Sequence, residues 1–384
     1  MDTQSVLFGL LRIAVCGAEA RDELKTACTP EALAEVCRVT DRHDLTHLIG
    51  QAANKLGLPD CDAIAKAKQT AMYALMRYMR LDFDCQQAYG VLEQAQIPFL
   101  PLKGAVMRAE YPEPWMRTSC DVDILVPEAQ LEAAAKALAK AGFTVGEKTD
   151  HDIQVRTPSG CILELHYDTI QERYDETGGS RQVLARIWED ATPKTPGSFH
   201  MVMSDAMFYF YHMAHMAKHF SVGGCGIRSV LDVWLLCRKP HDEAARRALL
   251  QEGGMDKYAR GMEALSRYWF DGETPDAMTR SVNDYILRGT LYGDNENRAA
   301  LGQARSGGKF KYLLTQRIFM PYEYLKDEYP VLKTHKWLTP LYQPVRWGRM
   351  LFSGRLGRTV AELKANAGTA DTATAGQILD HLGL

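Results

Sequence analysis

Apolar side chains recur at helical spacing along the first quarter of the chain. Over residues 62–94 no proline interrupts the pattern, and Met72, Met76 and Met79 follow one another at intervals of four and three residues. Residues three and four apart share a face of an α-helix, so the pattern predicts one long helix over this segment.

A second helix signal lies upstream of this segment. Thr29 followed by Pro30 is typical of an N-cap with proline in the first turn, and the residues after it favour a helix. Residues 1–96 are therefore predicted to form an N-terminal helical region.

Short apolar runs bounded by proline and glycine replace the helical pattern after residue 96. The predicted strands cover residues 97–102, 122–126, 143–145, 152–157 and 161–167. An alanine-rich segment over residues 128–141 predicts a helix that Gly142 closes, and Pro158, Ser159 and Gly160 predict a hairpin turn. The order β-α-β-α-β-β-β over residues 97–195 indicates a small mixed sheet with helices packed on it.

Helical patterns return in the last part of the chain. Residues 205–220 and 227–238 are predicted helices, joined by a glycine-rich loop over residues 223–226. Residues 196–384 are accordingly predicted to form a C-terminal helical domain. The predicted fold class is α+β, mostly α, with a small mixed β-sheet core between N- and C-terminal helical regions.

Composition narrows the class of protein. The 384 residues are 46% hydrophobic, which is enough for a large core. No apolar run is long enough for a membrane span, and the N-terminus lacks the pattern of a secretory signal, so we expect a cytoplasmic protein. The nine cysteines contain no C-x-x-C pair, which favours reduced thiols over a zinc site.

Charge is unevenly distributed along the chain. The net charge of −3 argues against long nucleic acid as a partner. Residues 301–364, however, hold twelve Lys or Arg and only four Asp or Glu. This basic segment is either a solvated helical face or a surface for an anionic partner.

Three carboxylates form the main candidate for chemistry. Asp121 and Asp123 are two residues apart at the start of a predicted strand, which puts both side chains on one face, with their Cα atoms about 6–7 Å apart. Glu164 lies in another predicted strand, on the face opposite to Leu163 and Leu165. Burying like charges together is unfavourable without a cation, and oxygen ligands suit Mg²⁺. The three carboxylates therefore predict a magnesium site, with Mn²⁺ as the alternative ion.

Two basic residues near these carboxylates are candidates for binding phosphate. Lys103 and Gly104 follow the first predicted strand, where glycine permits close backbone approach and helix N-terminal amides favour an anion. Lys103 offers a point charge and Arg117 a planar fork. Together with the strand order, these residues predict a nucleotide site.

The motifs in this region resemble those of a known superfamily. The sequence reads Leu-Lys-Gly at 102–104, Tyr-Pro at 111–112, Arg117, Asp-Val-Asp-Ile-Leu-Val at 121–126 and Leu-Glu-Leu-His at 163–166. This pattern resembles the DNA polymerase beta-like nucleotidyltransferases and, more closely, a bacterial family of nucleotidyltransferases within that superfamily. The resemblance implies a palm-like sheet, a bound nucleoside triphosphate and magnesium on the three carboxylates. The turn is Gly-Ala at 104–105, where the wider superfamily has Gly-Ser.

Three functions agree with these residues. The first is a two-metal enzyme that transfers a nucleoside monophosphate from a nucleoside triphosphate to an unidentified acceptor and releases pyrophosphate. In it Glu164 completes the metal site or acts as base, Lys103 and Arg117 neutralise the triphosphate, and His166 orients Glu164 or contacts the acceptor. The second is a kinase-like phosphotransferase that uses the same site and releases a nucleoside diphosphate. The third is a non-catalytic partner-binding module that keeps the palm fold. A small molecule, peptide or protein is a better acceptor than long nucleic acid.

A histidine cluster in the helical half adds a further candidate. His212, His215 and His219 lie on one face of a predicted helix. One interpretation is a buried polar seam in which Arg228 and Asp232 pair four residues apart. The others are a site for phosphates or acceptor and, less favoured for want of further ligands, a zinc site.

Overall fold

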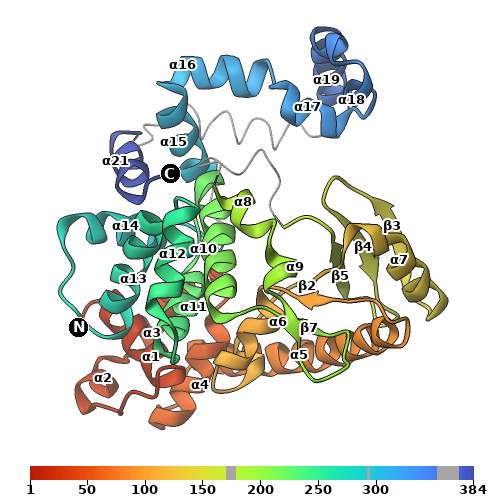
Figure 1. Cartoon of the computed structure of the whole chain (residues 1–384). Coiled ribbons are helices and arrows are strands. Elements are labelled where there is room, and N and C mark those ends of the chain that lie inside the picture. Colours follow the sequence, from red (N-terminus) through yellow and green to blue (C-terminus); the bar gives the residue numbers. More distant parts are fainter. Residues whose placement is uncertain (170–178, 292–294, 353–371) are drawn as a thin grey trace.

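The computed structural model describes residues 1–169, 179–291, 295–352 and 372–384. Figure 1 shows a small sheet on one side of the molecule and a helical body beside it. The helices α16–α19 extend away from that body (Figure 1). Part of the basic segment, residues 353–364, lies outside the described residues.

The N-terminal region is helical, as predicted. Its helices are α1 (Thr3–Ala14), α2 (Asp22–Ala27), α3 (Pro30–Arg42), α4 (Thr46–Leu56) and α5 (Asp62–Gln94). The Thr29 hydroxyl accepts a hydrogen bond from the amide of Ala32, and Pro30 occupies the first turn, so the predicted N-cap of α3 is confirmed.

The central part of the chain forms a mixed sheet of five strands in the order β1-β2-β5-β4-β3. The strands are β1 (Leu100–Pro101), β2 (Asp121–Leu125), β3 (Thr144–Lys148), β4 (Asp152–Arg156) and β5 (Ile162–His166). Strands β2 and β5 run parallel, whereas the other neighbours are antiparallel. The predicted turn between β4 and β5 is confirmed, with Gly160 at φ +91°. The α+β fold with a small mixed sheet is thus confirmed.

The first strand is shorter than predicted. Only Leu100 and Pro101 pair with β2, whereas the prediction ran over residues 97–102. Pro98 and Pro101 have no backbone N–H to donate to a ladder, which limits the pairing. Phe99 pairs instead with the segment near His200, to which it is joined by an isolated bridge. The nearby pair β6 (Thr192–Pro193) and β7 (Met201–Val202) was not predicted.

One face of the sheet is covered by helices α5 and α7. Short helical elements connect the strands: α6 (Gly104–Met107), η1 (Arg108–Glu110), η2 (Pro114–Met116), η3 (Glu128–Gln130) and α7 (Leu131–Lys140). The second half of α5 and all of α7 share a hydrophobic core with the sheet, to which Leu92, Leu138, Val122, Ile124 and Leu163 contribute. Because side chains alternate along a strand, the residues between them in β2 and β5 lie on the opposite face. That face carries the candidate site.

The remaining helices form the rest of the helical body and its extension. They are α8 (Ser180–Leu184), α9 (Ile187–Asp190), α10 (Asp205–Val222), α11 (Ile227–Arg238), α12 (Glu243–Glu252), α13 (Asp256–Phe270), α14 (Ala277–Arg288), α15 (Asn295–Ser306), α16 (Lys309–Tyr312), η5 (Leu313–Ile318), α17 (Tyr322–Glu328), α18 (Val331–Thr334), η6 (Lys336–Leu338), α19 (Thr339–Phe352) and α21 (Thr372–Leu382). Helices α10 and α11 match the predictions, and most of their residues are buried in the main core. Within the described ranges, no helix has the length and apolar character needed to cross a membrane.

The long helix α5 exposes the three methionines that indicate it in the sequence, together with Phe83. Met72, Met76, Met79 and Phe83 are 58–64% exposed. Leu81 is buried at 3%. The inward face of α5 is made instead by small residues and by a few larger ones, because the helix packs closely against α4 and the sheet.

Candidate active site

The register of the sheet brings together two carboxylates that are 41 positions apart in the chain. Asp123 of β2 lies opposite Glu164 of the parallel strand β5. Asp121 comes two residues earlier on the same face of β2. All three side chains line one cavity of about 500 Å³. The structure therefore brings the three predicted carboxylates to one place.

Asp123 is the best neutralised of the three carboxylates. Lys103 Nζ and His166 Nε2 each donate a hydrogen bond to Asp123 Oδ1 over 2.8 Å. Burial by itself would raise the pKa of Asp123, but the Lys103 charge and the His166 bond lower it below its ordinary value. His166 Nε2 also lies 3.2 Å from Glu164 Oε2. Burial opposes protonation of His166, yet its bonds to Asp123 and Glu164 raise the pKa of the imidazole.

Asp121 has the opposite electrostatic environment. Its pKa is raised, first by burial and then by repulsion from Asp123 and Glu164. A divalent cation would relieve this repulsion, and oxygen ligands are those that Mg²⁺ prefers. Among the described residues, the ligand atoms of Asp123, Glu164 and His166 lie within 4.8 Å of one another. The residues present thus fit a metal ion, although Asp121 lies outside this tightest group.

Lys103 reaches Asp123 from an unusual backbone conformation. Its φ of 45° and ψ of −117° are seldom adopted by a residue other than glycine. A Cβ at the adjacent Gly104 would lie 2.6 Å from Nη1 of Arg117, so a larger residue there would displace the end of that side chain. The backbone amides of Ala105, Val106 and Met107 in the first turn of α6 already donate hydrogen bonds to the carbonyls of Leu102 and Lys103. Phosphate binding at this turn would therefore rest on the Lys103 ammonium more than on these three amides.

Arg117 lines the cavity but already has a protein partner. Its Nη2 donates to Asp232 Oδ2 over 2.8 Å, and Tyr111 donates to Asp232 Oδ1 over 2.8 Å. The pKa of Asp232 is lowered: burial opposes this shift, but Arg117 outweighs it. The predicted pairing of Arg228 with Asp232 is wrong, because Arg228 instead donates to the carbonyl of Thr118 over 2.8 Å. Arg117 comes from the loop before β2 and reaches Asp232 across the interface between the sheet and α11.

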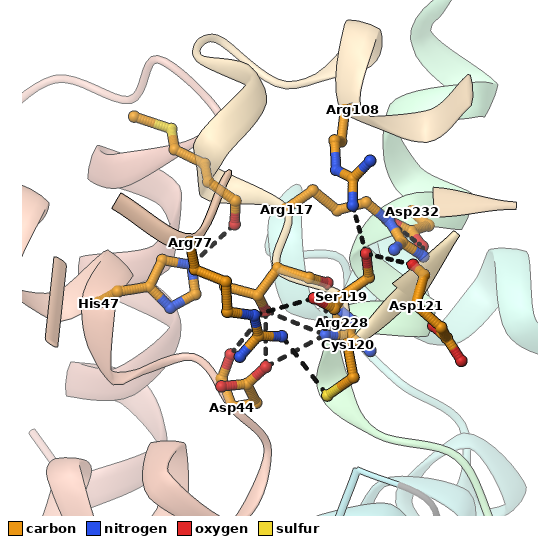
Figure 2. Close-up of polar contacts among 12 residues, drawn as sticks. Asp44, His47, Arg77, Arg108, Arg117, Ser119, Cys120, Asp121, Arg228 and Asp232 are labelled. Atoms are coloured by element: carbon orange, nitrogen blue, oxygen red, sulfur yellow. Dashed lines mark hydrogen bonds and ion pairs between the residues drawn. The ribbon is translucent and has the colours of Figure 1, made fainter. Parts of the chain in front are cut away.

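Polar contacts hold the loop that leads into β2, as Figure 2 shows. His47 of α4 donates to the carbonyl of Met116, and Arg77 of α5 donates to that of Ser119. Arg108 donates to the Ser119 hydroxyl, which in turn donates to the carbonyl of Asp121. The position of Asp121 is therefore set by residues from several distant elements.

Sequence reasoning did not identify His47, Arg77 or Arg108. Each lies on an element whose local pattern predicts only a helix, so no signal in the sequence near them points to the loop.

The helices α10 and α11 form the other wall of the cavity. Its lining includes His212, His215 and His219, so the predicted histidine face meets the carboxylate site. His215 and His219 contact each other with their Nε2 atoms 3.2 Å apart. Burial, then Lys103 and Lys218, lower the pKa of His219 to about 4, and both rings are neutral near pH 7. Within the described residues, no group able to hold a metal includes these three histidines.

A larger cavity of about 780 Å³ lies beside α5, β1 and α6. In its wall Tyr89 stacks on Phe99, and the His200 ring packs tilted against both. Among the described residues, neither group that could hold a metal contributes to this wall. The smaller cavity is therefore the candidate active site, because the charged residues converge there.

Comparison with known proteins identifies a matching family. A family model described as uncharacterised nucleotidyltransferase matches residues 30–271, which is more than half of the chain. No curated protein and no solved structure matches the chain. The matched range contains the N-terminal helices α3–α5, the whole sheet and the helices α10 and α11 that close the cavity. The chain therefore belongs to this family of uncharacterised nucleotidyltransferases.

Proposed function

We propose that this protein transfers a nucleoside monophosphate from a nucleoside triphosphate to an acceptor with release of pyrophosphate. The observation that carries the proposal is the register of Asp123 opposite Glu164, with Asp121 on the same face and Lys103 bonded to Asp123. Membership of the nucleotidyltransferase family and the likeness of the motif order to polymerase beta-like enzymes support it.

Each residue has a distinct part in this reaction. Asp121, Asp123 and Glu164 would hold Mg²⁺, which when bound neutralises phosphate oxygens and lowers the pKa of an attacking hydroxyl. Lys103 places a positive charge where the triphosphate enters. An acceptor oxygen attacks the α-phosphorus, the bond from that phosphorus to the bridging oxygen breaks, and pyrophosphate leaves. Glu164 would either complete this metal site or take the acceptor proton, and His166, whose Nε2 lies 3.2 Å from Glu164 Oε2, would orient the carboxylate.

Calorimetric titration with each of the four nucleoside triphosphates in the presence of Mg²⁺ tests the proposal. We expect one of them to bind, and we expect Asp121→Asn/Asp123→Asn to abolish the magnesium-dependent part of the binding. Asp84→Asn is the matched control, because Asp84 is also a buried carboxylate of this region but binds Thr157 and Ser159 away from the cavity. Binding of no triphosphate to the wild type would refute the proposal.

The released product separates nucleotidyl transfer from phosphoryl transfer. Once a triphosphate is identified, turnover with candidate acceptors is followed by pyrophosphate detection and by chromatography of the nucleotide. Pyrophosphate supports the proposal, whereas a nucleoside diphosphate would assign the site to a kinase-like phosphotransferase.

A further inference from the structure

Three side chains at the junction of β4 and β5 lie close enough together to bind one metal ion. Asp152 of β4 is directly opposite His166 of β5 in the antiparallel register, and His151 precedes Asp152. One ligand atom from each of the three lies within 4.8 Å of the ligand atoms of the other two. This group adjoins the one formed by Asp123 and Glu164, because His166 belongs to both.

His151 is oriented as a metal-binding histidine usually is. Its Nδ1 lies 2.8 Å from Asp150 Oδ1, and an ionised carboxylate only accepts, so Nδ1 carries the proton and Nε2 the lone pair. Histidines that bind metals commonly donate their other N–H to a carboxylate in this way. Nε2 lies 3.7 Å from Asp152 Oδ2, which is too far for a hydrogen bond. Two ligands of one tetrahedral ion, each about 2.1 Å from it, lie about 3.4 Å apart, so an ion fits between these atoms.

The other two ligands are buried and held in place. Asp152 is 8% exposed, and its Oδ1 accepts a hydrogen bond from the Thr149 hydroxyl, while Oδ2 is the oxygen nearer His151. His166 is 6% exposed, and its Nε2 donates to Asp123 Oδ1. In the neutral His166 ring the lone pair is therefore on Nδ1. The three side chains offer two imidazole nitrogens and one carboxylate oxygen.

These ligands favour a different ion from that of the three carboxylates. Mg²⁺ takes oxygen ligands, whereas imidazole nitrogen suits Zn²⁺. Two histidines and one carboxylate, with the fourth position left to water, are a known ligand set for zinc. We propose that His151, Asp152 and His166 bind a Zn²⁺ ion beside the carboxylates of the candidate active site.

The zinc ion acts on the active site through the shared histidine. One nitrogen of the His166 ring binds zinc, while the other donates to Asp123 and lies 3.2 Å from Glu164 Oε2. The ion thus fixes the ring that positions both carboxylates, and it takes no part in group transfer. The inference is independent of the proposed function, because zinc binding is measured without a nucleotide.

Calorimetric titration of the full chain with Zn²⁺ in excess Mg²⁺ tests the site. We expect Zn²⁺ to bind, and Asp150→Asn to weaken binding about tenfold, as loss of a carboxylate behind a ligating histidine does. His151→Asn removes a ligand and should weaken binding by more than Asp150→Asn. His241→Asn is the matched control, because His241 also contacts a carboxylate, that of Glu243, but belongs to neither group able to hold a metal among the described residues.

Thermal unfolding separates loss of the site from loss of the fold. Zn²⁺ should raise the unfolding midpoint of the wild type and leave that of His151→Asn unchanged, because only the wild type binds the ion in its folded state. In the presence of a chelator the two midpoints should agree. A midpoint of the wild type that does not respond to Zn²⁺ would contradict the inference.

Two other locations for zinc are distinguished by the same titration. A zinc affinity that is unchanged in His151→Asn would overturn the inference, and its loss in Asp121→Asn would then place the ion at the three carboxylates. Loss of binding in Cys120→Ser would also overturn it, because Cys120 is an exposed thiol that lines the same cavity. Absence of zinc binding to the wild type in excess Mg²⁺ would exclude the site altogether.

Discussion

Removal of the Asp232 carboxylate should destabilise the protein severely. Asp232 is 0% exposed and accepts hydrogen bonds from Tyr111 and Arg117. The substitution Asp232→Ala leaves the Arg117 guanidinium, whose side chain is 10% exposed, as a buried charge without its counter-ion. Breaking a buried ion pair in this way costs about 3–5 kcal/mol. The orphaned Tyr111 hydroxyl contributes to the same loss, so we expect a decrease of about 4 kcal/mol in the free energy of unfolding.

Urea unfolding followed by tryptophan fluorescence measures this decrease, because the chain has six tryptophans. Asp60→Ala is the control, because it removes an ion pair at the surface. The Asp60 side chain is 83% exposed and that of its partner Lys68 is 37% exposed, so the free energy of unfolding should change by less than about 1 kcal/mol. The double variant Asp232→Ala/Arg117→Met removes the orphaned charge and should recover part of the loss. A loss below about 1 kcal/mol for Asp232→Ala, or a double variant no more stable than the single one, would refute the reasoning.

Three further predictions concern other parts of the molecule. Gly104→Ala places a Cβ 2.6 Å from Nη1 of Arg117 and should weaken triphosphate binding in calorimetry. Gly90→Ala, with open space around it on α5, should instead raise the free energy of unfolding by about 0.5–1 kcal/mol in urea titration. Burial lowers the pKa of His43 to about 4. Below about pH 6.5 the imidazole is therefore protonated in the unfolded chain but still neutral in the folded chain. As a result, up to about 3 kcal/mol of the free energy of unfolding should be lost as the pH falls from about 6.5 to 4. His43→Gln should flatten this part of the pH profile, and an unchanged profile would contradict the assignment. Met76→Lys should alter the free energy of unfolding by less than about 0.5 kcal/mol because Met76 is 58% exposed, and a large loss would place this face of α5 in a contact.

Local patterns in the sequence predicted most of the elements and the face on which each carboxylate lies. Alternation along a strand depends only on the backbone, so Asp121 and Asp123 share a face in any sheet that contains them. The same holds for Glu164 and His166 on β5. The N-cap at Thr29 and the turn at Gly160 are equally local, and both are present.

Contacts between distant segments were not accessible from the sequence. The pattern over α5 predicts a helix but not which of its faces is buried. The face that carries Met76 is exposed because the opposite face packs against α4 and the sheet. Likewise, the spacing of Arg228 and Asp232 permits a helical pair, yet Asp232 binds Arg117 and Arg228 binds Thr118. A charged group pairs with the best-placed partner in space, and that partner comes from another element.

The sequence by itself therefore determined the types of element and the functional groups that each one carries. These are a strand with two aspartates, a turn with a lysine and a helix with three histidines. The tertiary structure alone decided that these form one site. The parallel register of β2 and β5 places Asp123 beside Glu164, and the packing of α10 over that face adds His212, His215 and His219. Register and packing arise from the burial of many side chains together, which no short segment of sequence specifies.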